Sequence, residues 1–187
     1  AMRKVLNSDI GIINGGNICK AIPKGVFTYK DILEVLPFGN SCAVKELSGQ
    51  QILDALEMGA RNLPRETGSF LHVSGLTYEV DASKHSTVVL NEKGAFVKVG
   101  GTYRVHNVQV AGKPLDLGKL YSVATITYLL EKNGDGMTML KNGKVLFIDE
   151  NMTDAEIVIE YIQNHLNARV GEEYANPLGE GRITIKY

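Results

Sequence analysis

Three short glycine-containing segments carry the residues of this chain that have the chemistry to bind a flat, polar ligand. The first, "INGGNICK" at residues 13–20, follows an apolar stretch. Its glycines, Gly15 and Gly16, allow positive φ angles and a close approach of the backbone to a ligand. Such a turn can bind an anion or a nucleoside through backbone N–H groups. Because it matches neither G-x-x-x-x-G-K-[ST] nor G-x-G-x-x-G, an ordinary tight turn is the alternative interpretation.

The second segment, "LPFGN" at residues 36–40, presents an aromatic side chain at a corner of the backbone. Pro37 fixes the incoming backbone and Gly39 frees the outgoing one. An aromatic ring in such a place can stack on a purine base, a contact worth about 1–3 kcal/mol per base in proteins that bind single strands. The alternative is that Phe38 covers the hydrophobic core. The two interpretations predict opposite exposures for the ring.

The third segment, "ITYLLEKNGDGM" at residues 126–137, combines an aromatic residue with a carboxylate. Tyr128 is predicted at the end of an apolar strand, and the N-G-D-G run that follows is a turn by default. The carboxylate of Asp135 can accept hydrogen bonds from a ribose hydroxyl or hold a basic side chain.

No pattern in the chain assembles a catalytic centre. The histidines are scattered and form no metal-binding spacing; they are His72, His85, His106 and His165. His165 falls on the apolar stripe of a predicted helix and is interpreted as the edge of the packed core. Cys19 and Cys42 fit neither a disulfide scaffold nor a four-ligand zinc site, and whether they pair stays open. With no G-x-S-x-G motif either, the chain looks like a binding unit without a catalytic unit.

Composition narrows the class of partner. The 187 residues include 20 basic and 21 acidic side chains, so no broad positive field for nucleic acid is expected. No apolar run approaches the roughly 20 residues that span a bilayer, and the start lacks the apolar core of a signal peptide. Ala1 and Met2 resemble an expression scar. We expect that the chain begins partway through a helix and was cut from a longer protein.

The pattern of elements predicts one α+β domain, residues 1–187, with a mixed β-sheet and a few helices. Helices are predicted at residues 29–36, 49–63 and 154–166, each preceded by a capping-box pair. Strands are predicted at residues 9–13, 41–47, 76–81, 86–91, 95–100, 103–112, 121–128, 144–149 and 182–187. Several strands in succession between helices favour this class over a regular alternating parallel sheet.

The order of "NGG-x-I", "PFGN", "TGSFLHVSG" and "ATITY…NGDG" resembles the C-terminal domain of 5'-nucleotidases, a family that includes bacterial UDP-sugar hydrolases. The resemblance runs from about Asp9 to the terminal "GEGRITIKY". It implies a separate N-terminal metallophosphatase domain that holds two divalent metal ions, with neither metal nor catalytic residues in this chain. It also implies a nucleotide or nucleoside ligand and an extracellular, cell-wall or periplasmic location.

The same resemblance implies a role for each candidate residue. Phe38 and Tyr128 would clamp the base, and Asp135 would bind the ribose hydroxyls. Amides of Asn14 and Asn40 would bond to base or phosphate. The substrate-binding set implied is Asn14, Gly16, Lys20, Phe38, Asn40, Gly68, Tyr128 and Asp135, with the backbone of Gly68 close to the ligand. One turn would thus face the phosphate and the other the base, with the helix between them setting their separation.

Two departures from the family pattern bear on these roles. The family loop usually reads G-G-G-I-R, but here Asn17 replaces the third glycine and Cys19 the phosphate-binding arginine. Lys20 can substitute as a point charge without the two-pronged geometry of arginine. The spacing to Asp135 is also one residue longer than the pattern, so Leu129 is an alternative to Tyr128 as second clamp residue.

These features favour the substrate-recognition domain of a 5'-nucleotidase, a hydrolase of nucleotide catabolism that would be inactive without its metal domain. One alternative is a binding or assembly module that keeps the fold but has lost the ligand site, as the missing arginine suggests. Another is an enzyme of 2',3'-cyclic nucleotides or 3'-nucleotides. Those relatives carry a different segment where "LPFGN" stands, which favours the 5' specificity by analogy.

Overall fold

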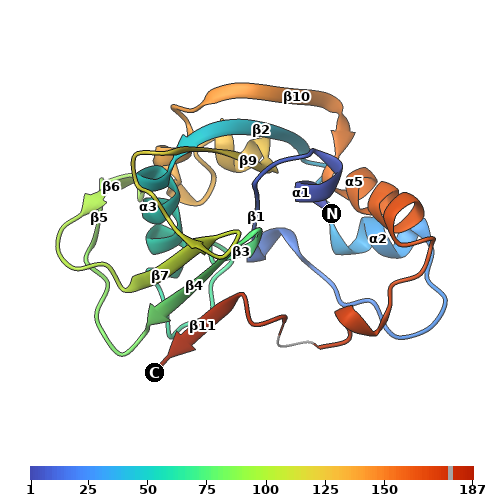
Figure 1. Ribbon diagram of the computed structural model, residues 1–187, viewed down its shortest axis with the longest axis horizontal. Coiled ribbons are helices and arrows are strands. Elements are labelled where there is room, and N and C mark those ends of the chain that lie inside the picture. The colour runs from blue at the N-terminus through green and yellow to red at the C-terminus, as the bar shows by residue number, and fades with distance from the viewer. Residues whose placement is uncertain (177–178) are drawn as a thin grey trace.

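Five strands form the larger sheet of the computed structural model, which describes residues 1–176 and 179–187 (Figure 1). In spatial order they are β10 (Lys144–Thr153), β2 (Ser41–Ser48), β9 (Leu120–Ile126), β1 (Ile10–Asn14) and β3 (Leu71–Ser74). β1 pairs in parallel with β9, and the other neighbours are antiparallel. The sheet is therefore mixed, as predicted.

The remaining strands form a second sheet and a hairpin. The second sheet has the order β11 (Ile183–Lys186), β4 (Leu76–Asp81), β7 (Val105–Val110) and β8 (Lys113–Pro114). β5 (Val88–Leu90) and β6 (Phe96–Val99) pair with each other. Each predicted strand overlaps an observed one, whereas β3 and the two-residue β8 are not indicated by the sequence pattern.

Capping boxes open the three longer helices, α2 (Tyr29–Val35), α3 (Gly49–Ala60) and α5 (Asp154–Glu160). In α3, Ser48 Oγ accepts from the backbone N–H of Gln51, whose side chain returns a bond to the N–H of Ser48. These local bonds satisfy backbone donors that a helix start leaves free, which is why the predicted starts are correct. Two further helices, α1 (Met2–Val5) and α4 (Thr127–Leu130), span about one turn each.

The predicted helix and strand ends are less accurate. α3 ends at Ala60 rather than at residue 63, and α5 continues only as a wider π-helical turn, Tyr161–His165. His165 is exposed and stacks on Tyr161, so its interpretation as a core residue is wrong. The predicted strand 121–128 ends at Ile126, and Tyr128 lies in α4 instead.

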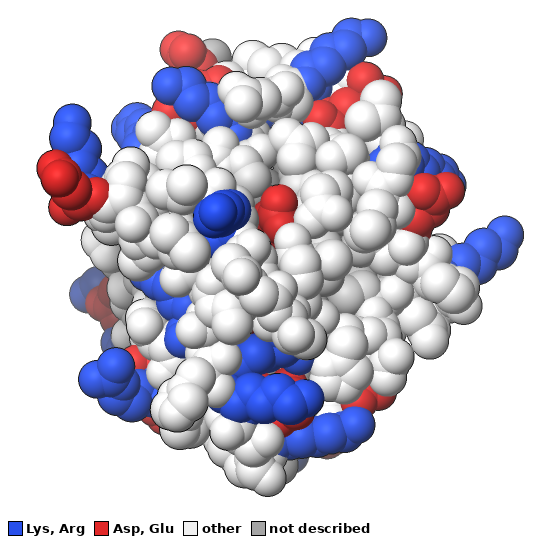
Figure 2. Space-filling model, turned by 90° about the vertical axis from the view of Figure 1, so that its left-hand side faces the viewer, with Lys and Arg blue, Asp and Glu red and all other residues white. Residues whose placement is uncertain are grey.

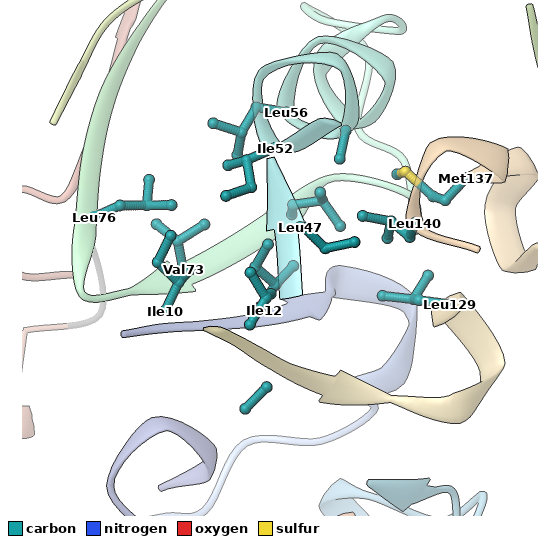
Figure 3. Packing of buried hydrophobic residues seen from close by; sticks show 14 of the residues in the cluster. Ile10, Ile12, Leu47, Ile52, Leu56, Val73, Leu76, Leu129, Met137 and Leu140 are labelled. Carbon is teal, nitrogen blue, oxygen red and sulfur yellow. The ribbon is translucent and has the colours of Figure 1, made fainter. Parts of the chain in front are cut away.

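The core lies between α3 and the larger sheet (Figure 3), where Ile52 and Leu56 of α3 face Leu47 and Ile12. Side chains alternate along β1, so Ile12 faces α3 while Ile13 faces the other side. There Ile13 packs on a second cluster formed by α2 and α5, which lie side by side (Figure 1). Helices on both faces fix the sheet, and with it the turns that leave its strands.

Short 3₁₀ turns continue from two of these elements. Gly15–Asn17 follows β1, and Gly134–Gly136 and Thr138–Leu140 follow α4; a further turn spans Glu172–Tyr174. On the face drawn in Figure 2, acidic and basic side chains are interspersed, without a large field of one sign.

Candidate functional site

The turn after β1 is closed by its own protein partners. The N–H of Gly15 donates to Phe70 O at 2.8 Å, and that of Gly16 to Gly68 O at 2.8 Å. A Cβ on Gly68 would lie 3.1 Å from the Cα of Gly16, so both segments need glycine for their close approach. Because these donors already bind carbonyl groups, the turn is not the backbone anion site that was one of its two interpretations.

The turn after α2 holds an aromatic ring out from the surface. Gly39 adopts a φ of +59°, and the side chain of Phe38 is 63% exposed. A ring with this exposure does not cover the core. The structure therefore excludes the core interpretation of Phe38 and leaves the ring accessible to a ligand.

The turn after α4 positions an aromatic ring and a carboxylate together. Asp135 takes a φ of +53°, and the Tyr128 hydroxyl lies 3.3 Å from Asp135 Oδ1 and from the Asp135 N–H. Gly134 leaves room for the ring, since a Cβ there would lie 2.3 Å from Tyr128 Cε1. Leu129 is fully buried in the core, so Tyr128 is the residue available to a ligand.

A buried amide connects this turn to the first one. Asn14, the last residue of β1, is 5% exposed, and its Nδ2 donates to Asp135 Oδ2 at 2.8 Å. Together with the Tyr128 hydroxyl, this bond gives the carboxylate a fixed orientation. Each carboxylate oxygen keeps further lone pairs for a ligand.

These turns enclose a pocket of about 300 Å³. Its lining residues are Asn14, Gly16, Asn17, Phe38, Asn40, Gly68, Tyr128 and Asp135. The structure thus brings together seven of the eight residues that the sequence singles out. Lys20 lies outside the set, and Asn17 is a lining residue that sequence reasoning missed.

Asn17 was missed because its polar side chain is buried only through distant contacts. It is 2% exposed, and its Nδ2 donates to Asp154 Oδ2 at 2.7 Å while its Oδ1 accepts from Asn40 Nδ2 at 2.8 Å. Burial raises the pKa of Asp154, and the hydrogen bond from Asn17 opposes that rise. The replacement of a family glycine by asparagine was the only signal in the sequence.

Charge is scarce at the pocket. Among the described residues that line it, Asp135 is the only charged one. The ammonium of Lys20 pairs instead with Glu34, whose hydrogen bond and charge raise the pKa of that lysine. Cys19 is exposed, and its Sγ lies 3.6 Å from the carbonyl oxygen of Gly16, which lines the pocket. Nothing in the lining therefore replaces the missing guanidinium.

The two cysteines are both free thiols. Cys42 is buried in β2, where loss of solvent, together with the charge of Asp154, raises its pKa to about 12.

No group of three or more His, Cys, Asp or Glu residues that could hold a metal ion occurs in the described part of the chain.

A second hollow, of about 800 Å³, lies between β1, α2 and the segment around residues 170–175. It is larger and mostly apolar, with Ile12, Phe27 and Val158 among its walls. None of the predicted site residues lines it. We place the candidate site in the smaller pocket, because that is where the polar and aromatic groups converge.

No helix in the described residues has the length and apolarity of a membrane span.

Comparisons with known proteins identify the family of this chain. Residues 1–142 match the family model described as "5'-nucleotidase, C-terminal domain". The 5'-nucleotidase of Vibrio parahaemolyticus is 28% identical over 92% of this chain and 26% of its own length. The trifunctional nucleotide phosphoesterase of Bacillus subtilis is 31% identical over 97% of this chain and 11% of its own length.

Solved structures give the same result for the fold. The 5'-nucleotidase precursor of Thermus thermophilus superposes with a TM-score of 0.77 at 34% identity, over 98% of this chain and 32% of the other. The NAD nucleotidase of Haemophilus influenzae has a TM-score of 0.70 at 24% identity, over 96% of this chain and 30% of the other, and supports the fold alone. The chain spans about a quarter of the first curated relatives that it matches. It belongs to the 5'-nucleotidase C-terminal domain family.

Proposed function

We propose that this chain is the nucleoside-recognition domain of a two-domain 5'-nucleotidase. It binds the base and ribose, while a separate metallophosphatase domain with two divalent ions hydrolyses the phosphate ester. The observation that carries the proposal is the pocket itself, in which the exposed Phe38 and the ring of Tyr128 accompany the half-buried carboxylate of Asp135. The same proposal implies an extracellular, cell-wall or periplasmic location, which fractionation of the source cells would test.

The size and chemistry of the pocket suit a nucleoside. Its volume of about 300 Å³ lies at the small end of the range for ligand sites. Two aromatic residues supply flat surfaces for a base. Asp135, oriented by Asn14 and Tyr128, supplies an acceptor for the donors of a ribose diol.

The phosphate has no counter-charge in this pocket. Asp135 would repel a phosphate placed beside it, so the ester is expected to project out of the pocket toward the metal domain. On this proposal the isolated chain binds adenosine about as well as AMP. It is also expected to lack phosphatase activity alone.

Titration calorimetry of adenosine and AMP into the chain, with amide shifts followed in parallel, tests the proposal. Saturable shifts at residues 38–40 and 134–136 are the expected result. The absence of binding at millimolar adenosine would count against the site. AMP binding much more tightly than adenosine would refute the placement of the phosphate outside it.

The alternative is a module that keeps the fold without its ligand, and Cys19 in place of the family arginine is the observation that favours it. Cys19→Arg decides between the two, because the Sγ of Cys19 lies 3.6 Å from the carbonyl oxygen of Gly16, a residue that lines the pocket. We expect the variant to bind AMP about 10- to 150-fold more tightly than adenosine, because one charged hydrogen bond is worth roughly 1.5–3 kcal/mol. Cys19→Met supplies length without charge as the control. No gain in Cys19→Arg would favour the module.

A further inference from the structure

A row of three polar side chains runs from the interior to the pocket and begins at Asp154. This residue opens α5 and is fully buried. Its Oδ1 accepts from the N–H of Ala155 at 2.9 Å and its Oδ2 from Asn17 Nδ2 at 2.7 Å. An ionised carboxylate can only accept hydrogen bonds, so the nitrogen of the Asn17 amide must face it.

That constraint passes through Asn17. Because its nitrogen faces Asp154, its oxygen faces the opposite way and accepts from Asn40 Nδ2 at 2.8 Å. Both groups of the amide are engaged and the side chain is 2% exposed, so the residue cannot reorient freely. Asn17 stands where the family pattern has a third glycine. Its side chain therefore donates to the Asp154 carboxylate and orients the amide of Asn40.

The row ends at Asn40, which lines the pocket. Its backbone is also fixed, since the N–H of Asp154 donates to Asn40 O at 2.9 Å. Because the amide nitrogen of Asn40 faces Asn17, and its side chain also hydrogen-bonds to the Asp154 carboxylate, the carbonyl oxygen is the group of this amide that is left for the pocket. Asn40 lines the same pocket as Phe38, the ring on which the base would stack.

The direction of this amide selects between bases. Adenine and cytosine carry an exocyclic amino group that donates hydrogen bonds, whereas hypoxanthine and uracil carry an oxygen at the same position. Two facing oxygens repel each other and leave both acceptors unpaired. We propose that Asp154 and Asn17, acting as positioning residues, orient Asn40 so that the site favours nucleosides with an amino-substituted base. The proposal rests on the proposed nucleoside-binding function and deepens it.

Two matched pairs of ligands test this at pH 8, adenosine against inosine and cytidine against uridine, titrated calorimetrically into the whole chain. We expect each amino nucleoside to bind about tenfold more tightly than its oxo counterpart, the worth of one net hydrogen bond. Equal affinities within both pairs would overturn the proposal while leaving nucleoside binding intact. If no nucleoside binds, the proposed function fails with it.

Variants separate orientation from stability. Asn40→Ala removes the oxygen and should bring the ratio of affinities to about one. Asp154→Asn replaces an obligate acceptor by an amide of similar shape that can donate or accept, so the ratio should also fall while adenosine still binds. Asn164→Ala, at an exposed asparagine outside the row, should leave the ratio unchanged.

Persistence of the tenfold ratio in Asn40→Ala would refute the role of that oxygen. Its persistence in folded Asp154→Asn would refute the role of the row. Should Asp154→Asn fail to fold, Asn40→Ala still decides, because Asn40 is only half-buried. A merely structural role for these residues would change the melting temperature and not the ratio.

Discussion

Replacing Phe38 by alanine separates ligand binding from stability, because the ring is mostly outside the fold. Full burial of a phenylalanine side chain contributes about 1.5–3 kcal/mol. Since Phe38 is 63% exposed, roughly a third of that, about 0.5–1 kcal/mol, is at stake in folding. Stacking on a base contributes about 1–3 kcal/mol, or roughly 5- to 150-fold in Kd.

We therefore expect Phe38→Ala to lose far more affinity than stability. For a domain of this size the loss in stability corresponds to a fall in Tm of no more than about 4 °C. Calorimetry with adenosine measures the first effect, and urea or thermal unfolding the second. Both are read on the same preparation, so misfolded material is detected directly.

Phe147→Ala is the matched control. Phe147 lies in the edge strand β10, is 43% exposed and does not line the pocket. It should cost a similar or larger amount of stability and leave the affinity for adenosine unchanged. A fall of 10 °C or so in the Tm of Phe38→Ala, or an affinity equal to that of the unmodified chain, would refute the assignment of Phe38 to the ligand.

Three further predictions concern packing, thiol chemistry and charge. Gly134→Ala should displace the pocket tyrosine, whose Cε1 would lie 2.3 Å from the new Cβ, and weaken adenosine binding several-fold by calorimetry; unchanged affinity would contradict it. In the native chain a thiol reagent should modify Cys19 within minutes and Cys42 only on unfolding, since Cys42 is buried with its pKa raised to about 12; two fast equivalents would contradict this. Arg104→Met should cost about 3–5 kcal/mol in urea by stranding the buried Glu57. Burial raises the pKa of the Glu57 carboxyl, so its contribution to stability is present at low pH and is lost as the pH rises through the folded pKa. The charge of Arg104 opposes this shift, so without Arg104 the deficit in stability should grow from pH 5 to pH 8. A deficit independent of pH would exclude this cause.

Sequence reasoning succeeded where the signal is local. A capping box lies within four residues, so the starts of α2, α3 and α5 could be predicted. Helix ends depend on tertiary packing and were less accurate. The one-turn helix α4 has no cap or periodic pattern of its own, which is why Tyr128 was assigned to a strand.

The site shows the same division. The aromatic corner at Phe38 and the glycine-flanked Asp135 have recognisable local chemistry, whereas the exposure of the ring and the shared pocket are seen only in the structure. Asn17 has none, because its partner Asp154 lies 137 residues further along the chain. The sequence suggested that the ammonium of Lys20 could bind a phosphate, but in the structure this ammonium forms an ion pair with Glu34.

The three turns of the pocket meet at the first one, and this explains why the chain places two turns so close together. Hydrogen bonds join the first turn to each of its neighbours: Gly15 and Gly16 bond to Phe70 and Gly68, Asn17 bonds to Asn40, and Asn14 bonds to Asp135. A further bond, from Cys19 N to Val35 O at 2.8 Å, joins the end of the first turn to the last residue of α2. The backbone N–H groups of Gly15 and Gly16 and the amide nitrogens of Asn14 and Asn17 are therefore engaged within the protein. On the proposed function, the positive charge that binds the phosphate would come from outside this pocket.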